Sequence, residues 1–299
     1  MISLEGVGLH SGKLARVTLL PAPVNTGIVF ISHEYGEKYG IRAHYKNLIN
    51  TSKAITVGNR AFNIMTIEHF MASLYSYDIS NAFVSVEGSE IPILDGSSKD
   101  FVRAIEEAGI EIQNEPQEVF HVPYPIWVEE NGSYLIVLPN SQFKITYTID
   151  FTSKSEAIGT QTAHYIINKN TFKHSIAPAR TFGFYEELEE MKRNNLALGG
   201  SLDNALLFTR GRLVNDGLRF TNECVRHKML DLIGDLSLIG CKVIGHFIAH
   251  KAGHSMDMAL VEKIDRALRR KKSRKAISRK FMERREFEFS RFKKRVNLI

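Results

Sequence analysis

The chain has 299 residues, 43% of them hydrophobic and 24% charged, the composition of an ordinary globular protein long enough for a large core or two domains. No apolar run approaches the roughly 18 residues needed to span a bilayer, and the first residues lack the basic region and apolar stretch of a secretory signal. The two cysteines, Cys224 and Cys241, are too few for a disulfide framework, so we expect a reducing, cytoplasmic location.

Positive charge is concentrated at the C-terminal end of the chain. The net charge is +6, but residues 261–299 hold 16 Lys or Arg and 5 Asp or Glu, so the preceding 260 residues sum to −5. A mildly acidic body argues against general nucleic-acid binding. We therefore expect no nucleic-acid partner.

Residues 1–113 predict a first domain that mixes short strands with helices. An insertion near 40–62 is short, polar and strand-like, and Asn114-Glu-Pro116 reads as a linker. The predicted elements are strands at 15–20, 27–31 and 82–86, and helices at 67–77 and 98–108.

Residues 117–265 predict a second domain of the same kind, with an insertion near 183–212 that holds a helix over 186–194, and residues 266–299 follow as a basic tail. Strands followed by helices in each half predict an α+β fold of two domains, each a sheet backed by helices. The predicted elements of this half are strands near 118–128, 133–138 and 143–150, and helices near 170–177 and 223–240.

Polar residues recur at steps of four in the helix predicted over 223–240. His227, Asp231 and Asp235 lie roughly on one stripe of this helix, because residues four apart share a face. Apolar residues fill most other positions, so the helix is buried. An imidazole and two carboxylates cost several kcal/mol there unless they are paired or bind a metal. The stripe therefore predicts a metal site.

A further ligand comes from the helix that begins near residue 67, with Thr66 as its predicted N-cap. His69 sits beside Glu68 in an otherwise apolar helix. Adjacent helical residues point about 100° apart, so both would not ligate well, and the glutamate would flank the ion as a general base. Two histidines and one carboxylate with an open fourth position is the pattern of catalytic zinc.

Seven short stretches of the chain resemble the zinc-dependent UDP-3-O-acyl-N-acetylglucosamine deacetylases of Gram-negative bacteria. They occur in the family's order, from about residue 5 to about residue 265. The stretches are Gly6-Val-Gly-Leu-His-Ser-Gly12, Thr66-Ile-Glu-His69, Glu90-Ile-Pro-Ile-Leu-Asp-Gly96, Ala179-Arg-Thr-Phe-Gly183, Gly199-Gly-Ser-Leu202, Arg226-His-Lys-Met-Leu-Asp231 and Gly253-His254.

The resemblance implies an amidohydrolase with Zn²⁺ as cofactor. Its substrate would be a UDP-sugar with one acyl chain, whose N-acetyl group is hydrolysed to acetate and a free amine in the committed step of lipid A synthesis. It also implies two similar layered domains packed face to face around the active site, and we expect a monomer. The two insertions would form a hydrophobic passage for the acyl chain. Leu198 and Leu202 favour that reading over surface decoration.

The resemblance also assigns roles in the reaction. His69, His227 and Asp231 would hold the zinc, and Glu68 would be the general base. His254, expected in a loop, would as imidazolium stabilise the oxyanion and protonate the leaving amine. The supporting residues are Asp235, which would hold and charge His254, Thr181, which would donate its hydroxyl to the oxyanion, and Lys228, which would add positive charge nearby.

Substrate contacts are implied for three further residues. Lys251 would face the diphosphate, and Asp150 and Phe151 would lie near the uracil and ribose. A solvent-facing charge or an ordinary strand end remains the alternative for each. Cys224 is a rival ligand by its spacing to His227, but it lies on a neighbouring face and the family does not use it, so we expect a buried small residue.

A second class of function is a binding protein whose basic tail docks on nucleic acid or an anionic membrane and whose metal is structural. Structural zinc is normally closed by four protein ligands, and the sequence offers three and a base, which favours catalysis.

Three features depart from the family pattern. The short segment before Gly6 predicts a missing or abbreviated edge strand. Asp257 stands where asparagine is usual, and its charge would raise the pKa of His254. The basic tail, interleaved with apolar residues, suits peripheral contact with an anionic inner membrane, with a solvated extension as the alternative.

Overall fold

The computed structural model describes residues 1–273 of the chain. Within this part, no helix is long and apolar enough to cross a membrane. The prediction of a membrane-binding tail falls largely on residues 274–299, which lie outside the described residues.

Two five-stranded sheets form the frame of the molecule, and they share one topology. The first has the order β1-β2-β8-β3-β4 and the second β10-β11-β17-β12-β13. In each, a central pair is parallel (β3 with β8, β12 with β17) and the other pairs are antiparallel. The strands are β1 (Ile2–Val7), β2 (Leu14–Pro21), β3 (Ile28–Ser32), β4 (Ile41–Arg42), β8 (Ala82–Glu87), β10 (Ile126–Glu130), β11 (Ser133–Leu138), β12 (Lys144–Asp150), β13 (Thr160–Ile166) and β17 (His246–His250).

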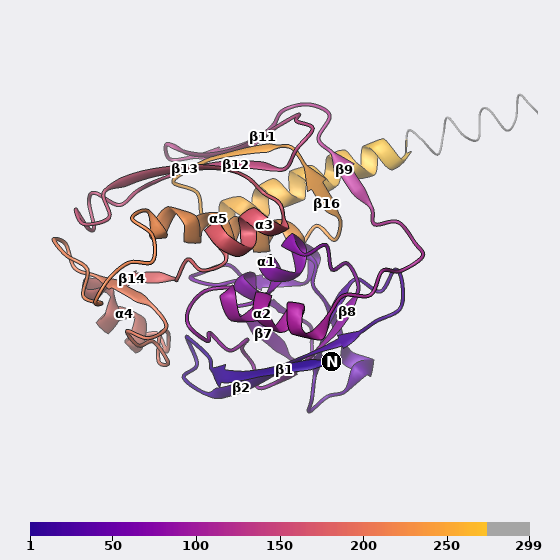
Figure 1. Cartoon of the computed structure of the whole chain (residues 1–299), viewed down its shortest axis with the longest axis horizontal. Helices are drawn as coiled ribbons and strands as arrows, with labels where there is room; N and C mark the ends of the chain where they lie inside the picture. Colours follow the sequence, from indigo (N-terminus) through magenta and orange to yellow (C-terminus); the bar gives the residue numbers. More distant parts are fainter. Residues whose placement is uncertain (274–299) are drawn as a thin grey trace, which may run out of the picture.

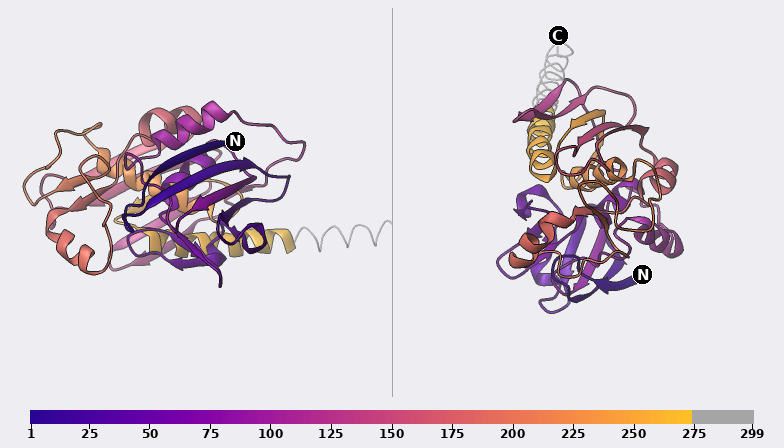
Figure 2. Two further views of the ribbon diagram at one scale, coloured as in Figure 1. Left: turned by 90° about the horizontal axis from the view of Figure 1, so that it is seen from below. Right: turned by 90° about the vertical axis from the view of Figure 1, so that its left-hand side faces the viewer.

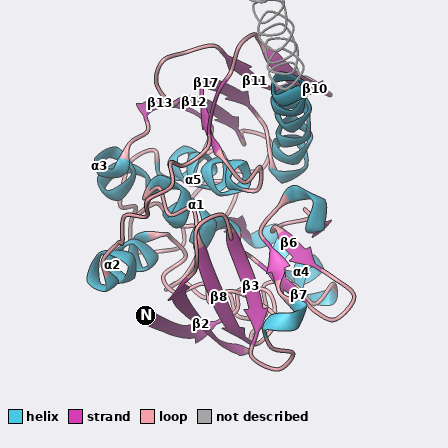
Figure 3. Ribbon diagram, turned by 90° about the vertical axis from the view of Figure 1, so that its right-hand side faces the viewer, coloured by secondary structure: helices cyan, strands magenta, loops and turns pink. Residues whose placement is uncertain are grey.

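Helices fill the space between the sheets, so the layers run sheet, helices, sheet, with α1 and α5 at the centre (Figures 1 and 3). In each sheet one face is buried against the helices; in β12, for example, Ile145, Tyr147 and Ile149 point inward. The main helices are α1 (Glu68–Ser76), α2 (Lys99–Ala108), α5 (Glu223–Ser237) and a last helix over 254–273. This arrangement confirms the predicted α+β fold of two similar layered halves.

Shorter elements decorate this frame. The insertion at 40–62 contributes to a three-stranded sheet, as its strand-like sequence predicts, and the insertion at 183–212 carries α4 beside a parallel strand pair. These elements are β5 (Leu48–Asn50), β6 (Thr56–Gly58), β7 (Asn63–Met65), α4 (Leu188–Arg193), β14 (Phe182–Phe184), β15 (Leu206–Phe208), β9 (Val119–His121), β16 (Lys242–Ile244), α3 (Lys169–Thr171) and the single turns Glu37–Tyr39, Tyr45–Asn47, Phe172–Ile176 and Tyr185–Glu187.

Some local predictions were wrong, and one central strand was missed. The strand predicted at 118–128 is two strands, separated at Pro123 and Pro125, and the first of them pairs with β16 in a sheet of its own. The central strand β17 was not predicted. The edge strand that was expected to be missing or abbreviated is present as β1, with six residues paired along β2. His254 begins the last helix rather than lying in a loop.

The last helix crosses the boundary placed at residue 265 without a break (Figure 2). Ala267 and Leu268 are buried, and Asp265 accepts a hydrogen bond from Tyr45 and pairs with Arg269. The described part of the tail therefore packs on the body of the protein. The domain limits at 113, 117 and 265 stay predictions.

Candidate active site

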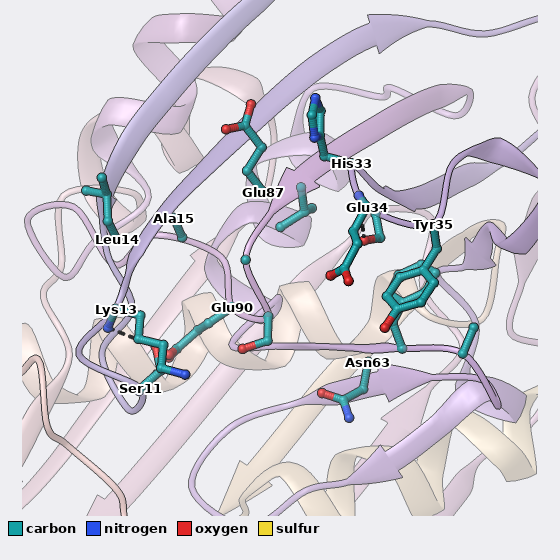
Figure 4. A pocket seen from close by; sticks show the side chains of 16 residues that line it. Ser11, Lys13, Leu14, Ala15, His33, Glu34, Tyr35, Asn63, Glu87 and Glu90 are labelled. Carbon is teal, nitrogen blue, oxygen red and sulfur yellow. Dashed lines mark hydrogen bonds between the residues drawn. The ribbon is translucent and has the colours of Figure 1, made fainter.

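The first turn of α1 is fixed by a buried glutamate. Thr66 is not an N-cap: it has a φ of +58°, unusual for a β-branched residue, and its hydroxyl donates to Glu90 at 2.7 Å. The backbone N–H groups of His10 and Ser11 also donate to this carboxylate, at 2.9 and 2.8 Å. Figure 4 shows Glu90 beside Ser11 at one end of a polar pocket that no predicted site residue lines. The Gly6–Gly12 motif thus holds the strained residue that precedes Glu68 and His69.

Helices α1 and α5 cross closely because residue 234 is glycine. A Cβ atom at Gly234 would lie 2.1 Å from the carbonyl oxygen of Glu68, so any larger residue would push the helices apart. This close crossing brings the start of α1 against the polar stripe of α5.

His69, His227 and Asp231 meet at this crossing, and all three are buried. One potential ligand atom from each lies within 4.8 Å of the others. Asp231 Oδ1 is 3.3 Å from His227 Nε2 and 3.6 Å from His69 Nε2. Zinc bonds of about 2.0–2.2 Å at tetrahedral angles would place two ligand atoms about 3.3–3.6 Å apart. The two distances from Asp231 Oδ1 therefore match those between ligand atoms of a zinc site.

His227 is neutral, and this favours a cation between its Nε2 atom and the carboxylate of Asp231. Burial lowers the pKa of His227 to about 4, so the imidazole is neutral. Its Nδ1 lies 3.0 Å from the carbonyl oxygen of Ala179 and must donate to it. Nε2 then carries a lone pair that faces a carboxylate oxygen of Asp231. Two acceptors at 3.3 Å repel each other unless a cation lies between them.

The carboxylate of Asp231 is held in its charged form. Burial opposes its ionisation, but the Lys228 ammonium, which donates to Asp231 Oδ2 at 2.8 Å, and the neighbouring imidazoles keep the pKa of Asp231 well below its usual range. Burial likewise opposes the charge on Lys228, yet the Asp231 carboxylate raises the pKa of that ammonium. Lys228 thus orients the Asp231 carboxylate through its second oxygen.

The segment that carries Thr181 is tied to the first turn of α5. Glu223 is fully buried and accepts hydrogen bonds from the backbone and the guanidinium of Arg180, at 3.0 and 2.9 Å. The Thr181 backbone N–H donates to Gly96 at 2.8 Å. The Arg180–Glu223 pair fixes the Ala179 carbonyl that orients His227, and it fixes the position of Thr181 two residues later.

Glu68 is buried beside the three ligand residues, and Ile55 N–H donates to its Oε2 at 3.1 Å. Burial raises the pKa of Glu68, and the charge of His254 opposes that rise. The backbone contact holds one carboxylate oxygen, so the other can receive a proton.

His254 and Asp235 form an acid–base pair across two helices. His254 Nδ1 lies 2.7 Å from Asp235 Oδ2. Burial alone would lower the pKa of His254, but the Asp235 charge and this hydrogen bond outweigh it and raise the pKa to about 10. Asp257 is buried next to the pair, and the expectation that its charge raises the pKa of His254 stays a prediction. His254 is therefore an imidazolium at neutral pH.

The three predicted substrate residues lie at one end of the second sheet. Lys251 Nζ is 3.7 Å from Asp150 Oδ2, where β12 and β17 end together. Phe151 packs against Phe182 with ring centroids 5.4 Å apart, and Phe182 in turn lies 6.2 Å from the His227 ring. Phe182 and Phe151 thus lie between His227 and the Asp150–Lys251 pair.

Comparison with known proteins identifies the family. Residues 1–266 match the family described as UDP-3-O-acyl N-acetylglycosamine deacetylase. The chain belongs to this family. Similar proteins with the name UDP-3-O-acyl-N-acetylglucosamine deacetylase come from Leptospira biflexa serovar Patoc (40% identity; 87% of this chain and 86% of the relative), Thermodesulfovibrio yellowstonii (42%; 88% and 89%) and Acidithiobacillus ferrooxidans (41%; 87% and 86%).

Several motifs of this deacetylase family act through the backbone, which the sequence alone did not reveal. A Cβ atom at Gly199 would lie 2.2 Å from the carbonyl oxygen of Gly8, so two glycine-rich turns pack directly on each other. Ala197 N–H donates to the Nδ1 of buried His10 at 3.2 Å in the same contact. Glu90 and Glu223 carry no role in the sequence prediction. The sequence indicated them only by position: Glu90 lies in a stretch that resembles the family, and Glu223 lies in the helix predicted over 223–240.

Cys224 is buried, as expected, and burial raises the pKa of its thiol well above the usual range. A thiol that holds its proton so firmly is a poor metal ligand. Among the described residues, it belongs to neither group of side chains with metal-binding spacing.

Proposed function

We propose that this protein hydrolyses the N-acetyl group of UDP-3-O-acyl-N-acetylglucosamine, releasing acetate and the free amine in the committed step of lipid A biosynthesis. The proposal rests on membership of the deacetylase family over residues 1–266. The observation that carries the chemistry is the neutral His227 whose bare Nε2 faces Asp231 Oδ1 at 3.3 Å, with His69 beside them.

We assign His69, His227 and Asp231 as the zinc ligands, since two imidazoles and one carboxylate are the donor set of a catalytic zinc site. Zinc, when bound there, polarises a carbonyl and lowers the pKa of water towards about 7. Three protein ligands leave a coordination position for the reaction. A structural role, which would use four, is the weaker reading.

The side chains around the ligands supply proton transfer. Glu68 takes the proton of the attacking water as that water adds to the acetamide carbonyl. The C–N bond of the resulting tetrahedral species then breaks, and the His254 imidazolium gives its proton to the departing amine. Asp235 orients and charges His254 through the 2.7 Å contact.

Thr181 and Lys228 complete the assignment of the catalytic groups. Thr181 donates its hydroxyl to the oxyanion, and Lys228 adds positive charge beside Asp231. Lys251, Asp150 and Phe151 bind the nucleotide part of the substrate. Their grouping at one sheet end, with an aromatic ring between them and His227, supports a site for a diphosphate and a flat base there.

We infer a cytoplasmic monomer with a UDP-sugar as its small-molecule partner and no nucleic acid. Contact of the tail with an anionic inner membrane stays a prediction. Residues 274–299 hold ten Lys or Arg and three Asp or Glu, and the last described helix leads into them. A truncation that probes the tail should end after Ser273, because Ala267 and Leu268 are buried.

A single assay tests the proposed function. Purified protein is incubated with the acylated UDP-sugar, and acetate release is measured with and without a chelator. We expect turnover that chelation abolishes and one equivalent of Zn²⁺ restores, while circular dichroism shows that the fold persists. Loss of the fold on chelation, with no turnover beforehand, would instead support the structural metal.

The insertion at 183–212 gives a prediction about the acyl chain. Leu198 and Leu202 are 50% and 48% exposed on this insertion, so both side chains are accessible to an acyl chain. Each buried methylene contributes about 0.8 kcal/mol, so a long acyl chain should dominate affinity. Leu202→Asp is expected to weaken binding of the acylated substrate at least tenfold, with about the same affinity for UDP-N-acetylglucosamine, measured by calorimetry.

Leu14→Asp is the matched control for this change. Leu14 is 66% exposed on β2 and lies outside the insertion, so its replacement should alter neither affinity. If Leu202→Asp weakened the binding of both ligands equally, the insertion would be a surface feature that does not contact the acyl chain.

A further inference from the structure

A third acidic residue lies against the His254–Asp235 pair. Asp257 is one turn after His254 on the last helix, and Asp235 comes from α5. A ring nitrogen of His254 and one oxygen of each carboxyl group lie within 4.8 Å of one another. Both aspartates are 0% exposed. Two carboxyl groups therefore share one dry site beside a single imidazole.

The hydrogen bonds of this cluster leave three oxygens without a partner. Asp235 Oδ2 accepts from His254, but Asp235 Oδ1 and both oxygens of Asp257 are buried and unpaired within the described residues. A buried acceptor without a donor is costly, and two adjacent buried carboxylates also repel each other. One proton shared between the two groups removes the repulsion and pairs two of the three oxygens.

The surrounding charges favour the same arrangement. Lys228 and Asp235 face Asp257 from α5, His254 faces it from its own helix, and Tyr147 faces it from β12. Lys228 donates to Asp231 and Tyr147 donates to the Ala252 carbonyl. With Asp257 neutral, two cations (Lys228 and His254) balance two carboxylates (Asp231 and Asp235).

The pKa of Asp257 agrees with this balance of two positive and two negative charges. Burial, followed by the charge of Asp235, raises the pKa of Asp257 well above its usual range, and the positive charges of Lys228 and His254 do not reverse the rise.

We propose that Asp257 is a positioning residue that acts as a neutral carboxylic acid, its O–H donating to Asp235 Oδ1. This donor holds the Asp235 carboxylate in place and leaves Oδ2 for His254. Asp257 thereby supports His254 without adding a negative charge beside it. The inference rests on the proposed role of His254 as the acid of the deacetylase reaction.

Two substitutions separate the donor from the charge. Asp257→Asn keeps a donor of similar shape and cannot ionise, so kcat should stay within about threefold of wild type. The pH at which activity falls on the alkaline side (the alkaline limb of the pH profile) should also stay the same, since the substitution removes no charge. Asp257→Val removes the donor and should lower kcat about tenfold, the size of a hydrogen bond to a charged group, with zinc content unchanged.

Infrared spectroscopy gives a readout that does not depend on activity. The stretching band of a protonated, buried carboxyl group should be present in wild type, with and without zinc, and absent from Asp257→Asn. This measurement decides the role of Asp257 even if Asp257→Val fails to fold or the wild type fails to hydrolyse the acylated UDP-sugar.

Three results would overturn the proposal. A downward shift of the alkaline limb by about one pH unit in Asp257→Asn would show that an ionised Asp257 had been charging His254. Absence of the infrared band in wild type would show the same directly. A second equivalent of zinc that is lost in Asp257→Asn would show that the two aspartates share a cation instead of a proton.

Discussion

Replacing His227 by alanine is expected to abolish turnover and zinc binding together. The three ligand residues offer no spare donor, because Lys228 already occupies the second oxygen of Asp231. Loss of an outer hydrogen-bond partner typically costs about 10–100-fold in metal affinity, and loss of a ligand should cost more. Zinc content by elemental analysis, read beside acetate release, tests this expectation.

His164→Ala is the matched control for this substitution. His164 is exposed on β13 and forms a hydrogen bond with Thr146, so its loss should leave both zinc and turnover unchanged. Full zinc content and full turnover in His227→Ala would place the metal elsewhere. Asp231→Asn should behave like His227→Ala, because an amide oxygen is a much weaker zinc ligand than a carboxylate.

The helix stripe allowed part of this site to be predicted from sequence. A step of four residues fixes which side chains share a helical face, so the sequence alone is enough to place His227, Asp231 and Asp235 together. The stripe does not show which of these residues would bind the metal and which would support another side chain. In the folded protein, Asp231 faces two imidazoles while Asp235 faces His254. That division depends on which element packs opposite each turn of α5.

Contacts made by the backbone could not be predicted in this way. The Ala179 carbonyl fixes the tautomer of His227, and the N–H groups of His10 and Ser11 hold Glu90. Every residue type except proline carries both groups, so composition and periodicity contain no sign of these contacts.

The fold could likewise be predicted from the sequence only in part. Each half was predicted as a sheet backed by helices, but the central strand β17 was missed. It is short, and its sequence, His246–His250, is only three apolar residues with a histidine at each end, a weak strand signal. Its place between β11 and β12 comes from pairing with residues about 100 positions earlier. The identical strand order of the two sheets is likewise a property of pairing and not of residue identity.

Substitutions of the acid–base residues are expected to leave zinc bound and remove catalysis. Glu68→Gln and His254→Ala should each lower kcat by about 10²–10⁴-fold, the usual worth of general acid–base assistance. Zinc content should stay at one equivalent, since neither residue is among the three ligands. If the Glu68→Gln protein lost its zinc, Glu68 would have to be counted among the zinc ligands.

The pH profile of Asp235→Asn tests the coupling of that pair. The Asp235 carboxylate is the main cause that raises the pKa of His254 to about 10. A general acid works only while protonated, so activity should fall as the pH rises through the pKa of His254. An amide in place of Asp235 removes the charge, and the alkaline limb should move to lower pH by at least about one unit, with a lower kcat.

Asp265→Asn is the control for that profile. Asp265 is also buried on the last helix, but it pairs with Tyr45 and Arg269 instead of His254. Its replacement can lower stability but should not move the alkaline limb. If Asp235→Asn kept the wild-type limb, the group that titrates there could not be His254, and another side chain would have to protonate the leaving amine.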